Sequence, residues 1–297
     1  MVIASAPGKV ILFGEHAVVF GEPSIAGAIN KRVIVEADRI KSGIKINSTD
    51  SNDYRYVEKA VDVLFDYLGK TKGVRLKISS QIPPASGLGS SAAVSVATIL
   101  SVSTLLNEKL EKKKIAQLGH QVEREVQGVA SPTDTFTSVY GGVQYINPLK
   151  NRHENLESTF PLVVGYTGIE RSTKNLVNNV AILRNKHPDI IDPLIKQIGE
   201  ITKMAKMRII NEEDFGDLMN INHGILESLG VSTEALSKLV HVARDAGAIG
   251  AKITGAGGGG CIIAYTPLNK EDVIQAISDC KCLAIDTSIS LEGVKLV

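Results

Sequence analysis

Residues 83–93 read PPASGLGSSAA and join a turn-forming segment to the most apolar stretch of the chain. Gly87 and Gly89 allow backbone N–H groups to approach an anion, and a predicted helix over 90–106 begins directly after them, with its dipole favouring negative charge. Ser90 and Ser91 can donate to phosphate oxygens or bind a cation. No Lys follows the second glycine, so this is not the nucleotide-binding P-loop. An ordinary helix start capped by Ser90 or Ser91 remains an equal alternative.

Composition sets the class of protein. A chain of 297 residues exceeds the usual size of one core, so we expect two domains or one domain with two lobes. Its 33 Lys and Arg nearly balance its 32 Asp and Glu, which argues against nucleic acid as a partner. Three cysteines, Cys261, Cys280 and Cys282, fit neither a disulfide framework nor the usual zinc spacings, and predict reduced thiols in the cytoplasm.

Membrane association and export are not expected either. Residues 92–106 are apolar but short for a membrane span, and they include five Ser or Thr residues, so they fit a buried helix of a soluble protein. The amino terminus has no basic region ahead of its apolar residues and no long apolar run, so we expect no secretion signal.

Hydrophobic periodicity predicts an α+β architecture. Strands are expected over 10–13, 33–37, 74–78 and 143–146, and helices over 54–68, 90–106 and 113–127. The polar stretch 147–159 connects to a second half with predicted helices over 173–185, 189–208, 213–229 and 232–246. Two further strands surround a glycine run.

That glycine run lies in KITGAGGGGCIIAY, residues 252–265. Gly255, Gly257 and Gly260 satisfy G-x-G-x-x-G, but a strand follows where a dinucleotide-binding motif requires a helix. Five glycines in six residues carry a large entropic cost, so we favour close approach of the backbone to a ligand over a flexible hairpin loop.

Two further stretches place charged residues in unusual positions. APGKVILFGEHAVVFGEP, residues 6–23, puts Lys9, Glu15 and His16 around a short strand. EREVQGVASPTD, residues 123–134, begins with Glu123 and ends with Asp134. Each has an ordinary interpretation: a snorkelling Lys, a surface His, a solvated Glu, and a capping box from Ser131 to Asp134. Taken singly, they favour the ordinary interpretations.

The four stretches together resemble one family in order and type. Over nearly its full length the chain resembles the superfamily of galactokinase, homoserine kinase, mevalonate kinase and phosphomevalonate kinase, and residues 6–23 are specifically similar to its mevalonate kinase branch, in a compact archaeal or bacterial form. The resemblance implies a ribosomal-protein-S5-like amino-terminal lobe over 1–158 and a ferredoxin-like carboxyl-terminal lobe over 159–285. A last strand at about 286–297 would return to the first lobe, and the active site would lie between the lobes.

The resemblance also implies residue roles. Asp134 and Lys9 would be catalytic, with Asp134 either abstracting the proton of the acceptor hydroxyl or holding that hydroxyl while Lys9 polarises it. Ser91 and Glu123 would hold Mg²⁺. Glu15, His16, Ser131, Thr173 and the glycines would lie on the substrate side. In full, the implied ATP- and phosphate-binding residues are Pro84, Ala85, Ser86, Gly87, Leu88, Gly89, Ser90, Ser91 and Ala92, and the implied glycines are Gly257, Gly258 and Gly259.

The implied activity is phosphorylation of (R)-mevalonate at its 5-hydroxyl by ATP with Mg²⁺, by a cytoplasmic homodimer. Glu15 and His16 favour mevalonate over phosphomevalonate, homoserine or a sugar. A ligand sensor without turnover is a further alternative, although Lys9, Glu123 and Asp134 are all present. Ala85 and Phe20 depart from the usual pattern of the family and bear on loop shape and acceptor preference.

Overall fold

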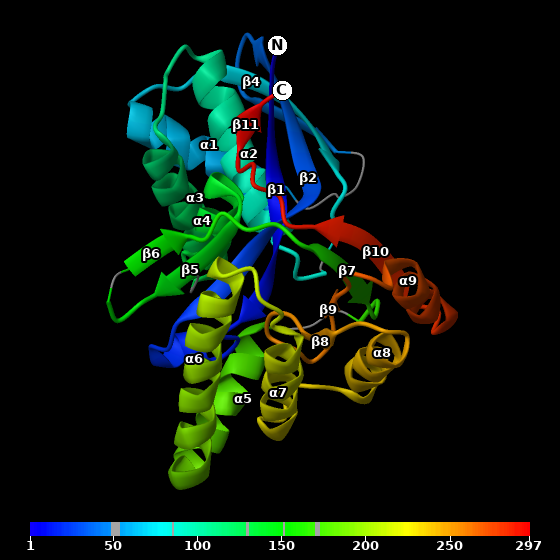
Figure 1. Cartoon of the computed structure of the whole chain (residues 1–297). Helices are drawn as coiled ribbons and strands as arrows, with labels where there is room; N and C mark the ends of the chain where they lie inside the picture. The colour runs from blue at the N-terminus through cyan, green and yellow to red at the C-terminus, as the bar shows by residue number, and fades with distance from the viewer. Residues whose placement is uncertain (49–53, 85, 129–130, 151, 170–172) are drawn as a thin grey trace.

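The computed structural model describes residues 1–48, 54–84, 86–128, 131–150, 152–169 and 173–297 (Figure 1). Within these ranges the chain forms a larger and a smaller β-sheet, with helices against each, and the predicted α+β class is confirmed. None of the helices in these ranges is both long and apolar enough to cross a lipid bilayer.

The larger sheet is built around two long antiparallel strands, β1 and β2. Along one path its order is β11-β1-β2-β4-β3, with β5 pairing to β2 and β6 to β5. The bounds are β1 Val2–Phe13, β2 Ser24–Ile40, β3 Ile44–Ser48, β4 Gly73–Ser80, β5 Val143–Asn147, β6 Arg152–Asn155 and β11 Lys295–Leu296.

Both long strands extend well beyond the predicted segments. Residues 4–8 of β1, ASAPG, include fully buried Ala4 and Ala6 and carry little strand propensity of their own. The strand contacts α2, Ser90–Leu105, so tertiary packing decides its conformation. A break in the β1–β2 register between Pro7 and Lys9 marks an irregularity at the point where Lys9 enters the site.

Four helices lie on the same side of the larger sheet (Figure 1). They are α1 Arg55–Leu68, α2, α3 Lys112–Gln127 and α4 Thr133–Tyr140. Helix α2 packs on β1 and β2, while α1 and α3 pack over α2. Because α2 is covered on both sides it is apolar around its whole circumference, as the sequence predicted for a buried helix.

The smaller sheet has the antiparallel order β10-β7-β9-β8. Its strands are β7 Pro161–Tyr166, β8 Gly250–Ile253, β9 Cys261–Tyr265 and β10 Leu283–Ser288, and β8 is an edge strand. The helices of this half are α5 Thr173–Lys186, α6 Pro188–Ile210, α7 Gly216–Ser228, α8 Glu234–Asp245 and α9 Lys270–Asp279. Periodicity predicted α5 to α8 to within a few residues but missed β7, β10 and α9.

The carboxyl-terminal end of the chain lies on the larger sheet. Strand β11 pairs antiparallel with β1, and both chain ends lie at the same end of the molecule (Figure 1). Arg32 of β2 secures this segment by donating to the carbonyl oxygens of Gly293 at 2.7 Å and Ser5 at 3.1 Å. The short 3₁₀ helix η1, Ala17–Phe20, follows β1 and packs on α6.

Candidate active site

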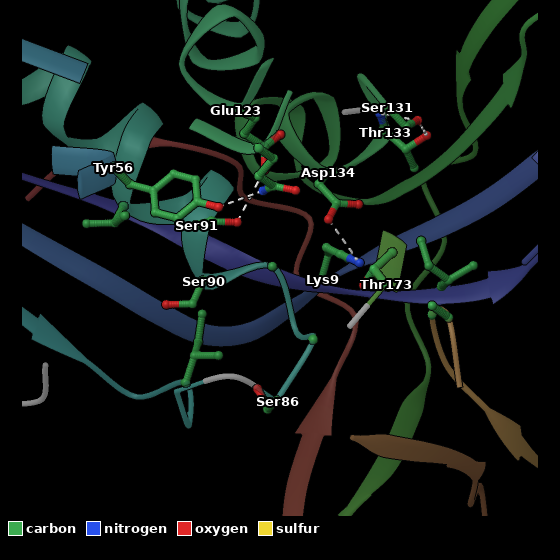
Figure 2. Close-up of a pocket in the computed structure, with 18 of the residues that line it drawn as sticks. Lys9, Tyr56, Ser86, Ser90, Ser91, Glu123, Ser131, Thr133, Asp134 and Thr173 are labelled. Atoms are coloured by element: carbon green, nitrogen blue, oxygen red, sulfur yellow. Dashed lines mark hydrogen bonds and ion pairs between the residues drawn. The ribbon is translucent and has the colours of Figure 1, made fainter. Parts of the chain in front are cut away.

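A cavity of about 780 Å³ opens where β1, the loop before α2, the starts of α4 and α5 and the glycine run meet (Figure 2). Most of the predicted site residues line it. They are Lys9, Glu15, His16, Pro84, Ser86, Gly87, Gly89, Ser90, Ser91, Glu123, Ser131, Asp134 and Thr173. Residues as distant in the sequence as Lys9 and Thr173 therefore line the same cavity.

The loop before α2 has the geometry of an anion-binding loop. Gly87 and Gly89 have φ angles of 80° and 76°, a conformation that residues with a Cβ rarely adopt. A Cβ on Gly89 would lie 2.7 Å from Cγ of Lys9, so the loop also needs glycine for its close approach to β1. The backbone N–H of Lys9 donates to the carbonyl oxygen of Leu88 at 2.8 Å and fixes this approach.

Helix α2 begins without a side-chain cap. Gly89 occupies the N-cap position, and neither Ser90 nor Ser91 caps the helix as the ordinary alternative required. The first N–H groups of an α-helix lack acceptors within the helix, and here they begin at the cavity wall. The two hydroxyls are thus free from a capping role, as a phosphate-binding site requires.

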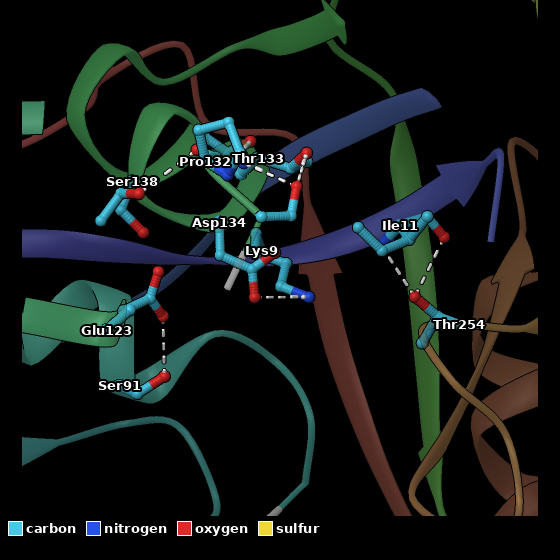
Figure 3. Close-up of polar contacts among 12 residues, drawn as sticks. Lys9, Ile11, Ser91, Glu123, Pro132, Thr133, Asp134, Ser138 and Thr254 are labelled. Atoms are coloured by element: carbon cyan, nitrogen blue, oxygen red, sulfur yellow. Dashed lines mark hydrogen bonds and ion pairs between the residues drawn. The ribbon is translucent and has the colours of Figure 1, made fainter. Parts of the chain in front are cut away.

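Ser91 and Glu123 form the candidate metal site (Figure 3). The Ser91 hydroxyl donates to Oε1 of Glu123 at 3.2 Å, while Oε2 is buried and has no hydrogen-bond partner among the described residues. Burial raises the pKa of Glu123 to about 8, with a further contribution from the charge of Asp134 that Lys9 opposes. One carboxylate and one hydroxyl suit Mg²⁺, which keeps phosphate and water oxygens for its remaining positions.

Lys9 and Asp134 form an ion pair within the cavity, and Figure 3 shows the two side chains directed toward each other. Nζ of Lys9 lies 3.1 Å from Oδ2 of Asp134. The Lys9 side chain is 6% exposed, whereas that of Asp134 is 31% exposed and so can be reached from the cavity. Helix α4 is held beside β1 by the Ser138 hydroxyl, which donates to the carbonyl oxygen of Pro7 at 3.0 Å.

The ion pair also decides between the two interpretations of residues 131–134. The Ser131 hydroxyl accepts from the backbone N–H of Thr133 at 3.3 Å and lies 2.8 Å from the Thr133 hydroxyl. Asp134, which a capping box would direct back toward Ser131, contacts Lys9 instead. The start of α4 therefore presents its carboxylate to the cavity.

Glu15 and His16 lie in the turn after β1, where they make buried contacts. The carboxylate of Glu15 is paired with Lys252 of β8, and neither side chain is exposed. Burial raises the pKa of Glu15 and lowers that of Lys252, while their mutual attraction opposes both shifts. Nε2 of His16 lies 2.9 Å from the carbonyl oxygen of Ala256. Sequence reasoning missed Lys252, because no local pattern distinguishes a buried lysine from an exposed one and its partner is distant in the sequence.

The glycine run meets the cavity at its beginning only. Gly255 and Ala256 line the cavity, but the predicted substrate residues Gly257, Gly258 and Gly259 are not among its described lining residues. They pack against protein: a Cβ on Gly257 would collide with the Val231 carbonyl oxygen, one on Gly258 would lie 2.7 Å from Leu176, and one on Gly259 would lie 2.7 Å from the Ile169 carbonyl oxygen. Close packing within the chain, rather than a ligand, explains glycine at these three positions.

Two members of the predicted phosphate-binding set, Leu88 and Ala92, are buried in the core and contribute backbone groups at most. A third, Ala85, lies outside the described residues. Sequence reasoning missed Tyr56 of α1 and Gln127 of α3, which line the cavity and are joined by a 2.7 Å hydrogen bond from the Gln127 amide to the Tyr56 hydroxyl.

The chain matches two family models, described as the GHMP kinases N terminal domain over residues 55–142 and the GHMP kinases C terminal over residues 204–281. It is 44% identical to a protein named mevalonate kinase from Thermococcus sibiricus, an alignment covering 99% of this chain and 98% of that protein.

Two solved structures of proteins named mevalonate kinase are also similar to this chain. The mevalonate kinase of Methanococcus jannaschii has a TM-score of 0.86 and 33% identity, covering 97% of this chain and 98% of that one. The L. major mevalonate kinase in complex with R-mevalonate has a TM-score of 0.89 and 25% identity, covering 97% and 96%.

Proposed function

Because the chain belongs to the GHMP kinase family, we propose that it transfers the γ-phosphoryl group of ATP to the 5-hydroxyl of (R)-mevalonate, giving 5-phosphomevalonate and ADP. The observation that carries the chemistry is the meeting, in one cavity, of the Lys9–Asp134 pair with the glycine loop at the start of α2. The acceptor follows from the full-length similarity to proteins named mevalonate kinase.

The donor side of the cavity is the glycine loop. Its backbone N–H groups, the first turn of α2 and the Ser90 hydroxyl bind phosphate oxygens. Ser91 and Glu123 would hold Mg²⁺, which when bound neutralises charge on the phosphates. Phosphoryl transfer depends mainly on positioning and charge stabilisation, and a pre-formed loop provides both.

The acceptor side is formed by β1 and the start of α4. Asp134 accepts a hydrogen bond from the 5-hydroxyl and receives its proton as the new bond to phosphorus forms. Lys9 stabilises the negative charge that develops on the hydroxyl oxygen. The bond between the γ-phosphorus and the bridging oxygen breaks, and ADP leaves with that electron pair.

The acceptor is tested by ADP release from the wild-type protein with ATP, Mg²⁺ and, in separate reactions, mevalonate, phosphomevalonate, homoserine and galactose. We expect kcat/KM for mevalonate to exceed the others by at least about 100-fold, because sites that bind a substrate's polar groups reject analogues lacking them. Phosphorus NMR of the product identifies the phosphorylated hydroxyl, and excess EDTA tests the need for Mg²⁺.

Preference for another acceptor would retain the phosphoryl-transfer chemistry and overturn the proposed substrate. Absence of turnover with all four would contradict the kinase and support a ligand sensor.

A further inference from the structure

Lys252 and Glu15 form an ion pair that solvent does not reach. Nζ of Lys252 donates to Oε1 of Glu15 and, at 2.8 Å, to the carbonyl oxygen of Ile253. Taking two opposite charges out of water is costly, and apolar residues of similar volume often replace such a pair without loss of stability. Stability alone is therefore a weak reason for the pair, and its location offers a better one.

Glu15 belongs to a turn with an unfavourable backbone. His16, the next residue, has φ +60°, which residues other than glycine adopt only where their surroundings fix them, and Gly14 has φ +95°. This turn carries His16 into the cavity wall. Its conformation therefore requires contacts from outside the turn.

Residues 252–256, a segment that begins in the smaller sheet, supply such contacts to β1 and to the turn. Besides the Lys252–Glu15 pair, the Thr254 hydroxyl oxygen accepts from the Ile11 N–H at 2.8 Å and donates to the Ile11 carbonyl oxygen at 3.0 Å (Figure 3). The Ala256 carbonyl oxygen meets Nε2 of His16. The segment thus holds the end of β1 and the following turn at three points.

The strand that carries Lys252 is itself fixed along its outer edge. The Asn220 side chain accepts from the backbone N–H of Ala251 at 3.1 Å, and the Arg244 guanidinium donates to the Ala251 carbonyl oxygen at 2.6 Å. These side chains of α7 and α8 satisfy backbone groups that an edge strand otherwise leaves open. Lys252 is thus presented from a rigid support.

We propose that Lys252 is a positioning residue for the acceptor side of the cavity: through Glu15 it holds the turn that places His16 where mevalonate binds. The inference rests on the proposed function, because it concerns how that acceptor is bound. The glycine loop before α2 is held by contacts in which neither Lys252 nor Glu15 takes part, from Lys9 N–H to the Leu88 carbonyl oxygen and from the Cys261 thiol to the Ser86 carbonyl oxygen at 3.3 Å. ATP binding should therefore not depend on Lys252.

The test is Lys252→Met, which keeps an unbranched side chain of nearly the same length and removes its charge. We expect the KM for mevalonate to rise at least tenfold while the KM for ATP stays within twofold of wild type. The matched control is Lys206→Met, because Lys206 also pairs with a carboxylate, Glu154, at 2.8 Å but is not among the residues that line the cavity. It should change neither constant.

A second variant covers the case in which Lys252→Met leaves Glu15 charged and prevents folding. Lys252→Met combined with Glu15→Gln removes both charges. We expect this double variant to fold, with the KM for mevalonate again raised at least tenfold and the KM for ATP within twofold of wild type. Wild-type KM for mevalonate in either folded variant, or an equal rise in both KM values, would overturn the proposal.

Hydrogen exchange separates this inference from the proposed function, because it needs no substrate. In the double variant, peptides covering 13–17 should exchange at least tenfold faster than in wild type, and peptides covering 88–94 should not change. Unchanged exchange over 13–17 would overturn the positioning role. If the double variant exchanges faster over 13–17 but the wild-type protein does not phosphorylate mevalonate, the proposed function is overturned and the positioning role is retained.

Discussion

At the scale of one residue, the buried carboxyl of Glu123 shows how its surroundings keep a proton bound. Its carboxyl is 3% exposed on α3 and lies within the electrostatic influence of Asp134, so the unliganded protein holds a proton there up to a pH of about 8. A cation held by Glu123 would take the place of that proton, because opposite charge favours the ionised carboxylate. The residue would then link metal binding, pH and stability.

A pH-dependent cost of folding follows for Glu123. At pH values below its ordinary pKa of 4.5 the carboxyl is protonated in both the folded and unfolded states. Between 4.5 and about 8 the unfolded chain has released the proton and the folded chain retains it, so the free energy of unfolding falls by up to about 1.4 kcal/mol per pH unit. Above that range the loss is complete.

Glu123→Gln removes the titrating group and should remove this loss. We expect the variant to gain stability relative to wild type as the pH rises from 5 to 8 in Mg²⁺-free buffer, as measured by urea denaturation. Glu125→Gln on the same helix is the control, since Glu125 is exposed and hydrogen bonds lower its pKa. A stability difference that does not vary with pH would contradict the buried, protonated state of Glu123.

The resemblance of its motifs to the kinase family predicted much of the cavity wall but not all contacts within it. Lys9 and Asp134 taken singly favoured ordinary interpretations, and their motifs together with the glycine loop that carries Ser91 identified them as site residues, which the structure brings together. Lys252 did not stand out, because a buried lysine is recognised by its partner, and Glu15 is 237 residues away. Contacts at such separations depend on the whole fold.

At the scale of elements, the loop and helix α2 act as one unit. Gly89 ends the loop, begins the helix and lets Lys9 pass against the backbone. The sequence predicted this unit well because glycine, serine and an apolar run are local signals. Strands β7 and β10 were missed because a strand depends on its pairing partners, here β10 with β7 and β7 with β9, and those partners are distant in the sequence.

Gly89→Ala tests this unit. The added Cβ would require an unfavourable φ of +76° and would displace Lys9, so we expect kcat to fall by at least about 100-fold, within the range lost when one catalytic group is misplaced. Gly43→Ala is a matched control with the same φ and no atom within 4 Å of the added Cβ.

Gly89→Ala and Gly43→Ala should each lose about 1–2 kcal/mol of unfolding free energy from backbone strain, as measured by denaturation. Gly43→Ala should keep wild-type kcat. Equal kcat in the two variants would show that the approach of Gly89 to Lys9 has no catalytic importance.

At the scale of the whole molecule, the site is assembled where the two sheets meet. Strand β1 of the larger sheet carries Lys9, helix α4 carries Asp134, and the segment after β8 of the smaller sheet completes the wall. The resemblance of short motifs predicted this meeting, whereas composition predicted only a soluble two-lobed chain. The lobe boundary near residue 158 and the homodimer stay predictions, which limited proteolysis and light scattering would measure.

The central claim is that Asp134, held beside Lys9, activates the acceptor hydroxyl. The measurement that tests it most directly compares kcat for mevalonate with the dissociation constant for mevalonate in wild type and Asp134→Asn, a change that keeps size and removes the proton acceptor. We predict that kcat falls by about 10²–10⁴-fold, the usual contribution of general base catalysis, while the dissociation constant changes by less than about threefold. A kcat within tenfold of wild type would contradict the assignment of Asp134 as the base.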